Sequence, residues 1–260
     1  MSTVAKTFWQ TLPLVRGVEL LGHDGNGLGA LAKPAGVLSH PNEPGRDRGR
    51  ALLDAEYDLE AECFVWTDAA SGDMRRLWLL NRLDSATSGV ILVAADGKLA
   101  ADVKAQFQRK AIAKTYVALV FGTPRVPRET WRDRMAVERK GGVVRSSAAG
   151  GHIPAESDCR VLRTARGAQP LALLELKPRT GRTHQLRVQC ARRQLPIVGD
   201  QTYGDFRRNR EFAKLARTKR LFLHSPRICG SPTTSESVVV STCNRAELYV
   251  ACDDVGTARE

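Results

Sequence analysis

The stretch LWLLNRLDSATSGVILVAA, Leu77–Ala95, decides the fold, because it places two apolar runs on either side of one polar turn. Both runs are short and uncharged, which is typical of buried strands. The turn carries Arg82 and Asp84 together with a Thr-Ser-Gly segment. An acid between core strands requires a partner or a function, since burial of an unpaired charge is costly.

The segments that follow predict one amphipathic helix and several strands. Asp96 is placed to cap a helix in which Leu99, Val103 and Phe107 recur every four residues, so one apolar stripe would pack on a sheet. Apolar runs predict strands at Val90–Ala94, Ala111–Gly122, Leu171–Pro178, Leu221–Ser225 and Ser237–Ser241, and the longer period of Thr180–Arg193 favours a helix.

The fold class that this order predicts is α+β, with a mixed, largely antiparallel central sheet and flanking helices. Strands outnumber helices and the two do not alternate regularly, which disfavours a doubly wound parallel sheet. Ser39–Arg50 and Arg139–Pro154 are rich in Gly, Pro, Ser or charge, and we expect both to be loops. No repeat or low-complexity linker divides the sequence, so we expect a single domain over residues 1–260.

The charge balance favours a polyanionic partner. The sequence holds 40 Lys and Arg residues against 28 Asp and Glu residues, which gives a formal net charge of +12. Lys and Arg that neutralise phosphates release counterions, so a basic excess suits nucleic acid, although a generic basic surface is the alternative. The densest basic segment, Arg207–Arg220, fits a solvated helix face equally well.

Cysteine usage and hydropathy indicate a cytoplasmic protein without a metal site. The six cysteines form no CxxC pair and have no histidine at finger spacing, so we expect buried thiols in a reducing compartment and no zinc. No apolar run reaches the roughly 18 residues that a membrane span needs, and the first residues do not form a signal peptide.

Four stretches, taken in their order and spacing, carry a resemblance to a known family. They are AKPAGVLSHP (Ala32–Pro41), NRLDSATSG (Asn81–Gly89), KTYVALVFG (Lys114–Gly122), and TGRTHQLRV with PIVGDQTYG (Thr180–Val188 and Pro196–Gly204). Together they resemble the RluA-type family of RNA pseudouridine synthases over about residues 20–225. The sequence departs from the family at Asn81, where a His is usual, and after Ser225, and its N-terminus is too short for the S4-type domain of many relatives.

This resemblance implies the pseudouridine synthase catalytic fold and an isomerase acting on uridines of structured rRNA or tRNA. The N1 glycosidic bond is broken, the base rotates, and C5 is joined to C1′ of the same ribose. The family uses no cofactor and no metal, and we expect a monomer whose partner is RNA.

The family's catalytic residues correspond to Asp84, Tyr116 and Arg187. An ionised Asp84 can attack C6 of uracil or C1′ of ribose, or remove the 2′ proton. Arg187 ends the His-Gln-Leu-Arg motif and would orient Asp84 and keep it charged, while Tyr116 would stack on uracil and take the C5 proton. Read alone, the three residues suit a turn Asp, a surface Arg and a core Tyr.

The expected RNA contacts are Arg82, Lys33, Arg182 and Thr183. A stacked uridine must be extruded before it can react, and Arg82 lies one residue from Asp84 on the same side of an extended segment, where it could fill the vacated space. A structural ion pair is the alternative for Arg82. Lys33, Arg182 and Thr183 would hold phosphates and 2′-hydroxyls.

A different class of function, a non-catalytic RNA-binding or ribosome-assembly factor, is the alternative. It predicts that Asp84→Ala leaves RNA affinity and cellular function intact. The Asp, Tyr and Arg argue against it, because a binder of an anionic ligand does not need a buried acid. A nuclease or deaminase would need carboxylate clusters or His/Cys metal ligands, which the sequence lacks.

Overall fold

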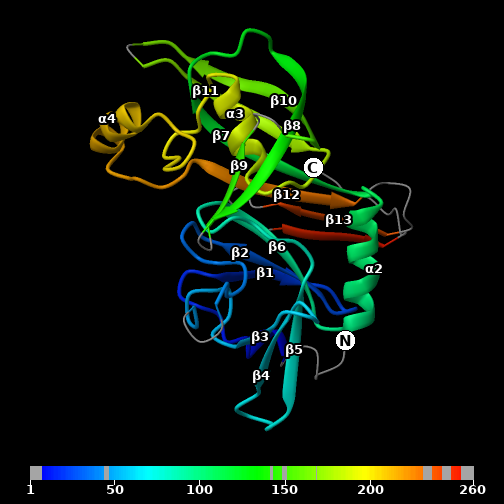
Figure 1. Cartoon of the computed structure of the whole chain (residues 1–260). Helices are drawn as coiled ribbons and strands as arrows, with labels where there is room; N and C mark the ends of the chain where they lie inside the picture. Colours follow the sequence, from blue (N-terminus) through cyan, green and yellow to red (C-terminus); the bar gives the residue numbers. More distant parts are fainter. Residues whose placement is uncertain are drawn as a thin grey trace. The chain divides into compact units, whose positions relative to one another are not determined.

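The computed structural model describes residues 8–43, 47–140, 143–147, 151–167, 169–230, 236–241 and 247–252 (Figure 1). The chain divides into two compact units, Met1–Ala113 with Pro226–Glu260, and Lys114–Ser225. It passes from one to the other within strands β7 (Ile112–Phe121) and β12 (Leu223–Gly230). The single catalytic domain expected over residues 1–260 stays a prediction.

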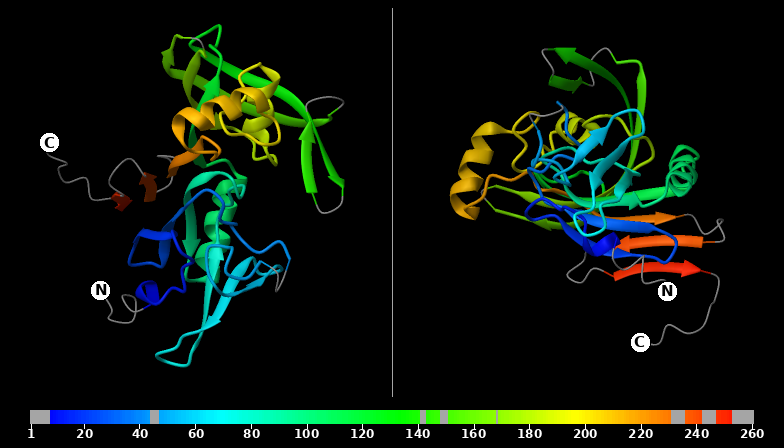
Figure 2. Two further views of the ribbon diagram at one scale, coloured as in Figure 1. Left: turned by 90° about the vertical axis from the view of Figure 1, so that its left-hand side faces the viewer. Right: turned by 90° about the horizontal axis from the view of Figure 1, so that it is seen from below.

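The first unit is built from antiparallel strands. Its strands are β1 (Glu19–His23), β2 (Leu28–Lys33), β3 (Glu56–Asp58), β4 (Cys63–Thr67), β5 (Met74–Leu79) and β6 (Ser88–Ala94). The β3-β4-β5-β6 path is joined on β6 by β2, which pairs in turn with β1. Figure 2 shows β13 (Glu236–Ser241) and β14 (Glu247–Cys252) side by side, and β13 pairs with the end of β12. All seven residues of β6 are buried, so it forms the centre of this unit.

Helix α2 (Gly97–Gln108) confirms the amphipathic helix predicted after the first strand pair. The Asp96 carboxylate accepts a hydrogen bond from the Leu99 amide at 2.9 Å, which makes Asp96 the N-cap. Val103 is buried, and Leu99 and Phe107 pack against the same apolar cluster. The four-residue spacing therefore buries one stripe on the sheet of this unit.

The second unit is also built from antiparallel strands, which follow one another in the order β7-β11-β10-β8-β9. Its remaining elements are β8 (Arg128–Lys140), β9 (Val143–Ser147), β10 (Ile153–Ala165), β11 (Leu171–Pro178), α3 (Gln185–Arg192) and α4 (Phe206–Ala216). Figure 1 shows α3 lying beside β8 and β10, and Gln189 of the helix hydrogen-bonds to Asp133 of β8 and Ala155 of β10.

Two sequence-based boundaries differ from the structure. The expected loop Arg139–Pro154 is wrong in part, because β8 extends to Lys140 and pairs with β9. The valines of Val143–Ser147 favour a strand, and the Gly and Ser around them obscured this signal. The strand expected at Leu221–Ser225 begins at Leu223 and runs on to Gly230.

The α+β class with a largely antiparallel sheet is confirmed. In the described part of the chain, no helix combines the length and the apolar composition that crossing a membrane demands. Cys63, Cys159 and Cys190 are buried free thiols, and Cys229 is partly exposed.

Candidate active site

The turn that carries Asp84 lies in the first unit and is anchored on its N-terminal side by Ser39. The Ser39 hydroxyl donates to the Leu83 carbonyl at 2.8 Å and accepts from the Leu83 amide at 3.0 Å. Thr87 closes the turn by donating its amide to the Asp84 carbonyl at 3.0 Å. Leu83 is buried and Asp84 is partly exposed, so the anchor holds the backbone beside a residue that is not fully enclosed.

Lys33 and Gly36 anchor the C-terminal side of the same turn. The Lys33 ammonium donates to the Ser85 carbonyl at 3.0 Å, and the Gly36 amide donates to the same oxygen at 2.8 Å. Lys33 also donates to the carbonyls of Pro34 and Val37, at 3.1 Å and 2.6 Å. The φ of Gly36 is +96°, which a residue with a side chain rarely adopts, so this approach favours glycine.

This geometry differs from the phosphate contact expected for Lys33. Lys33 is only 2% exposed, and an ammonium has three protons, which match the three carbonyls that it binds. Lys33 therefore joins the loop after β2 to the residue that follows Asp84.

Replacement of Lys33 by Met tests this anchor through its pH dependence. Burial lowers the pKa of Lys33 from 10.5 to about 8, an effect that the charge of Asp84 partly offsets. Between these two values the unfolded chain binds more protons than the folded chain, so the free energy of unfolding contributed by Lys33 rises with pH. Urea titrations of the wild type and Lys33→Met from pH 7 to pH 10.5 should show the difference between them increasing by roughly 3 kcal/mol in favour of the wild type. A difference independent of pH would contradict the lowered pKa.

Arg82 is exposed and contacts His40, which belongs to a stacked pair of aromatic rings. Its Nη1 lies 3.2 Å from Nε2 of His40, whose Nδ1 lies 2.9 Å from the Pro41 carbonyl. Because only a protonated Nδ1 can donate to that carbonyl, Nε2 is the acceptor for Arg82 in the neutral ring. The His40 ring stacks on Tyr57 with centroids 4.9 Å apart. The guanidinium is thus positioned at the surface, one residue from Asp84.

Asn81, the departure from the family motif, has a clear structural role. The residue is buried, its carboxamide oxygen accepts the Leu92 amide at 2.8 Å, and its Nδ2 donates to the Val90 carbonyl at 3.4 Å. A carboxamide carries both a donor and an acceptor, so the Asn81 side chain satisfies one backbone carbonyl and one backbone amide of β6. Asn81 fixes the start of the Asp84 turn against β6.

Arg187 lies in the second unit and forms a buried pair with Asp200. Nε and Nη2 of the guanidinium donate to the two carboxylate oxygens, each at 2.8 Å. The two side chains are 8% and 1% exposed. Burial opposes ionisation of Asp200, but the hydrogen bonds and charge of Arg187, with the amides of Thr202 and Tyr203, outweigh it and lower its pKa. The bidentate geometry fixes the orientation of the guanidinium.

The loop that carries Asp200 is held by hydrogen bonds to helix α4. Asn209 of α4 accepts the Gly199 amide at 2.7 Å and donates to the Asp200 carbonyl at 2.9 Å. Gly199 has a φ of +79°, and a Cβ atom there would lie 1.8 Å from the Arg220 carbonyl oxygen. A side chain at this position would displace the loop and with it the partner of Arg187.

An aromatic residue completes the surroundings of Arg187. Its Cζ lies 5.0 Å from the centroid of the Tyr203 ring, which is within cation–π distance. The Tyr203 hydroxyl is 2.9 Å from Nδ1 of His184, which caps α3 with a φ of +55°. His184 is therefore a hydrogen-bonded neighbour of this cluster.

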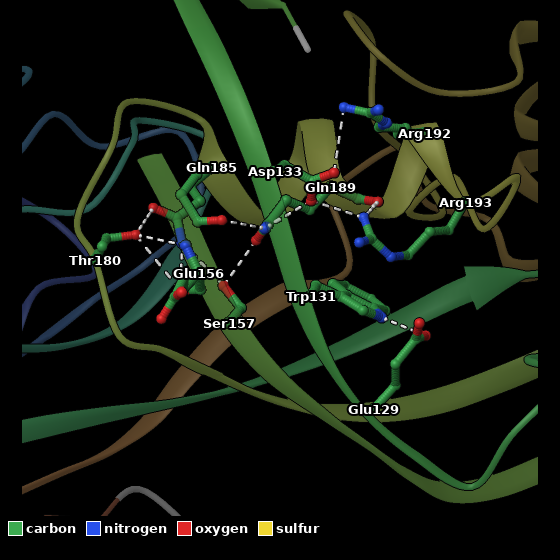
Figure 3. Close-up of polar contacts among 11 residues, drawn as sticks. Glu129, Trp131, Asp133, Glu156, Ser157, Thr180, Gln185, Gln189, Arg192 and Arg193 are labelled. Atoms are coloured by element: carbon green, nitrogen blue, oxygen red, sulfur yellow. Dashed lines mark hydrogen bonds and ion pairs between the residues drawn. The ribbon is translucent and has the colours of Figure 1, made fainter. Parts of the chain in front are cut away.

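A buried polar network fixes the helix on which Arg187 lies (Figure 3). Gln185 donates to the Glu156 carbonyl and the Ser157 hydroxyl, each at 2.9 Å, and accepts from Thr180 at 2.8 Å. One turn later, Gln189 accepts from Ser157 at 2.7 Å. Because both glutamines are buried with partners from β10, small shifts of α3 would leave polar groups unsatisfied.

The remaining predicted residues also lie in the second unit. Tyr116 is buried on β7 opposite Leu176 of β11. Arg182 and Thr183 are exposed before α3, and Nε of Arg182 donates to the Pro154 carbonyl at 3.1 Å. The first unit thus gathers Asp84, Arg82 and Lys33, and the second holds the others. The pairing of Asp84 with Arg187 stays a prediction.

The sequence-based search missed several residues of these clusters. Asp200 lies inside the family motif Pro196–Gly204, where an acid directly after Gly199 was the available signal. Ser39 and His40 lie at the end of the first quoted stretch. Asn209 sits in the basic segment Arg207–Arg220 and carried no signal, because its contacts depend on the tertiary fold.

Comparison with known proteins identifies the family. A family model described as RNA pseudouridylate synthase matches residues 28–192, more than half of the chain. The chain is 32% identical to tRNA pseudouridine synthase C of Yersinia pestis over 82% of this chain and 81% of that protein. It is 30% identical to the uncharacterized RNA pseudouridine synthase YhcT of Bacillus subtilis over 85% and 67%.

Solved structures agree on the fold. Human RNA Pseudouridylate Synthase Domain Containing 1 superposes with a TM-score of 0.63 at 23% identity, covering 92% of this chain and 91% of that one. A second human protein, RNA Pseudouridylate Synthase Domain Containing 4, gives a TM-score of 0.59. The family model and the curated relatives show that the chain belongs to the RluA-type family of RNA pseudouridine synthases and is an isomerase.

Proposed function

We propose that this enzyme converts specific uridines of a structured RNA to pseudouridine through the Asp84 carboxylate. The observation that carries the proposal is the Asp84 turn itself, which is anchored on both sides by Ser39 and Lys33 while Asp84 is partly exposed. Such rigidity holds a reactive group in one orientation, which is what attack on a bound nucleotide requires.

The reaction breaks the N1–C1′ bond and forms a C5–C1′ bond, with loss of the C5 proton and gain of a proton at N1. An ionised Asp84 serves as nucleophile towards C6 or C1′, or as base at C2′. Arg187 orients this acid from its rigid pair with Asp200, and the ring of Tyr116 stacks on the uracil. The chemistry proceeds with side chains alone, without metal or cofactor.

Structured tRNA or rRNA is the proposed substrate class. The Yersinia pestis relative is named as a tRNA enzyme. The net charge of +12 suits a folded polyanion, and Arg182 and Thr183 at the exposed entry to α3 would contact its phosphates and 2′-hydroxyls. We propose that the enzyme acts as a cytoplasmic monomer.

Release of tritium tests the function directly, because C5 must lose its hydrogen. Unmodified tRNA and rRNA transcripts carrying uracil labelled at C5 are incubated with the enzyme, and the released label is counted. We expect release from a defined RNA to a plateau of whole uridines per molecule. Absence of release from every tRNA and rRNA transcript would overturn the proposal.

Arg82→Ala tests the extrusion of the base. Unstacking a nucleotide costs about a few kcal/mol, so loss of the side chain that fills the gap should slow tritium release from folded RNA by about tenfold or more. An unstructured oligonucleotide with the same uridine pays less for unstacking and should lose activity much less. Arg16→Ala, an exposed arginine of the same unit, is the matched control. Equal loss on both RNAs would contradict a role in extrusion.

A further inference from the structure

A basic groove in the second unit lies outside the residues assigned to the reaction. It encloses about 530 Å³ and is lined by the β7–β8 connection, the beginning of β8, and the end of α3. Its lining includes Arg125, Glu129, Trp131, Arg192, Arg193 and Gln194. Its volume lies within the range of about 300–1,000 Å³ that is common for ligand sites.

The groove carries a positive excess. Three arginines line it against a single acid, Glu129, whose carboxylate accepts the indole N–H of Trp131 at 3.0 Å (Figure 3). Arg125 is exposed, and the side chain of Arg192 is 51% exposed. Exposed guanidinium groups that line a groove can donate paired hydrogen bonds to phosphate oxygens.

Two of the arginines are held in place by one buried acid. Asp133, 3% exposed in its side chain, lies 2.8 Å from Nη1 of Arg193 and 3.3 Å from Nη1 of Arg192. Arg193 also donates from Nη1 to the Gln189 carbonyl, and its Cζ lies 4.6 Å from the Trp131 ring centroid. The hydrogen bonds of Arg193 to Asp133 and to the Gln189 carbonyl both come from Nη1. They fix the guanidinium and do not involve Nε or Nη2. Because the single carboxylate of Asp133 pairs with both Arg192 and Arg193, the three groups together keep a net positive charge.

The groove is separate from the Arg187 cluster although both use α3. Arg192 follows Arg187 by five residues, which is about 7.5 Å along the axis and about 140° around it. Arg187 accordingly contacts Asp200, whereas Arg192 contacts Asp133. A ligand in the groove therefore meets a different face of the helix.

We propose that this groove binds a phosphodiester segment of the substrate RNA outside the uridine that reacts. The inference rests on the proposed function, because it takes RNA as the substrate. The fixed guanidinium of Arg193 on Trp131 offers a flat cation for a base or phosphate, and Arg125 and Arg192 neutralise neighbouring phosphates. Such contacts add affinity and position without reading sequence.

The experiment measures how RNA affinity depends on salt. Arg125→Gln and Arg192→Gln are compared with the wild type by fluorescence anisotropy, from 50 to 200 mM KCl, on the transcript that releases tritium. Arg109→Gln is the control, since it removes the same charge from an exposed arginine at the end of α2. Each groove variant should weaken binding about threefold to tenfold and lower the slope of log K against log salt by roughly 0.7–0.9, the value for one phosphate. The rate at saturating RNA and the Arg109→Gln slope should stay unchanged.

The outcomes distinguish this inference from the proposed function. Wild-type slopes for both groove variants, with normal tritium release, would overturn the groove and leave the function standing. Absence of tritium release from every RNA would overturn the function, and the slopes on bulk tRNA would then decide the groove alone. Arg125 takes no part in the Asp133 pairs, so its variant separates loss of an RNA contact from damage to the fold.

Discussion

Asp84→Asn is expected to lower tritium release from the substrate RNA by about 10³-fold or more, because it removes the ionised group that would act as nucleophile or base. The carboxamide has nearly the same shape, and the anchors of the turn are backbone carbonyls and amides that Asn leaves in place. Thermal unfolding and RNA affinity should therefore stay close to the wild type.

Asp54→Asn is the matched control for this variant. Asp54 belongs to the same unit, is exposed, and pairs with Arg48 at 3.3 Å. Exposed pairs of this kind contribute about 0–1 kcal/mol, and the substitution should leave tritium release unchanged. Release by Asp84→Asn at the wild-type rate would refute the catalytic assignment and favour an RNA-binding factor that keeps the fold.

Asp200→Asn is expected to lower the free energy of unfolding by about 3–5 kcal/mol, because it leaves the buried Arg187 guanidinium without its carboxylate. Urea unfolding followed by circular dichroism measures the loss. The pKa of Asp200 is lowered in the fold, so its contribution to stability is present above its ordinary value of 3.8 and is lost as the pH falls below it. The difference from Asp200→Asn should shrink accordingly in acid.

The double variant Arg187→Met with Asp200→Leu separates stability from function. Replacement of a whole buried pair by apolar groups is often neutral, so much of the lost stability should return. Tritium release should nevertheless remain at least about 10²-fold below the wild type, since the group that orients Asp84 is gone. A stable and fully active double variant would show that Arg187 is purely structural. Arg207→Ala, which loses an exposed contact with Glu211, controls for the change of charge.

The strands around the Asp84 turn were predictable because each is a local pattern. The apolar run of β6 and the four-residue stripe of α2 depend on neighbours in sequence, and burial follows them closely. The hairpin of β8 and β9 was missed, since its pairing is set by the partner strand rather than by composition.

Some residues of the candidate site could likewise be predicted from local motifs, whereas others are recognised only from tertiary contacts. Asp84, Tyr116 and Arg187 were predicted because they lie in long motifs, whereas Asp200 is recognised only in the structure, as the residue that Arg187 contacts. Lys33 shows contacts that the sequence did not indicate, and its contact with phosphate stays a prediction. A lysine in a basic protein suggests a phosphate contact, but the Lys33 ammonium binds three backbone carbonyls. The neighbouring sequence does not indicate where those carbonyls point, because the tertiary fold sets their orientation.

The anchors of the Asp84 turn also bear on how the enzyme folds. Ser39 and Leu83 are 44 residues apart, and Lys33 and Ser85 are 52 apart. Contacts of this separation require loop closure, so we expect the turn to acquire its final geometry late, when β2 has docked on β6. Hydrogen exchange of the Leu83 amide during refolding would lag behind that of the α2 amides, and catalytic competence would appear as one of the last steps of folding.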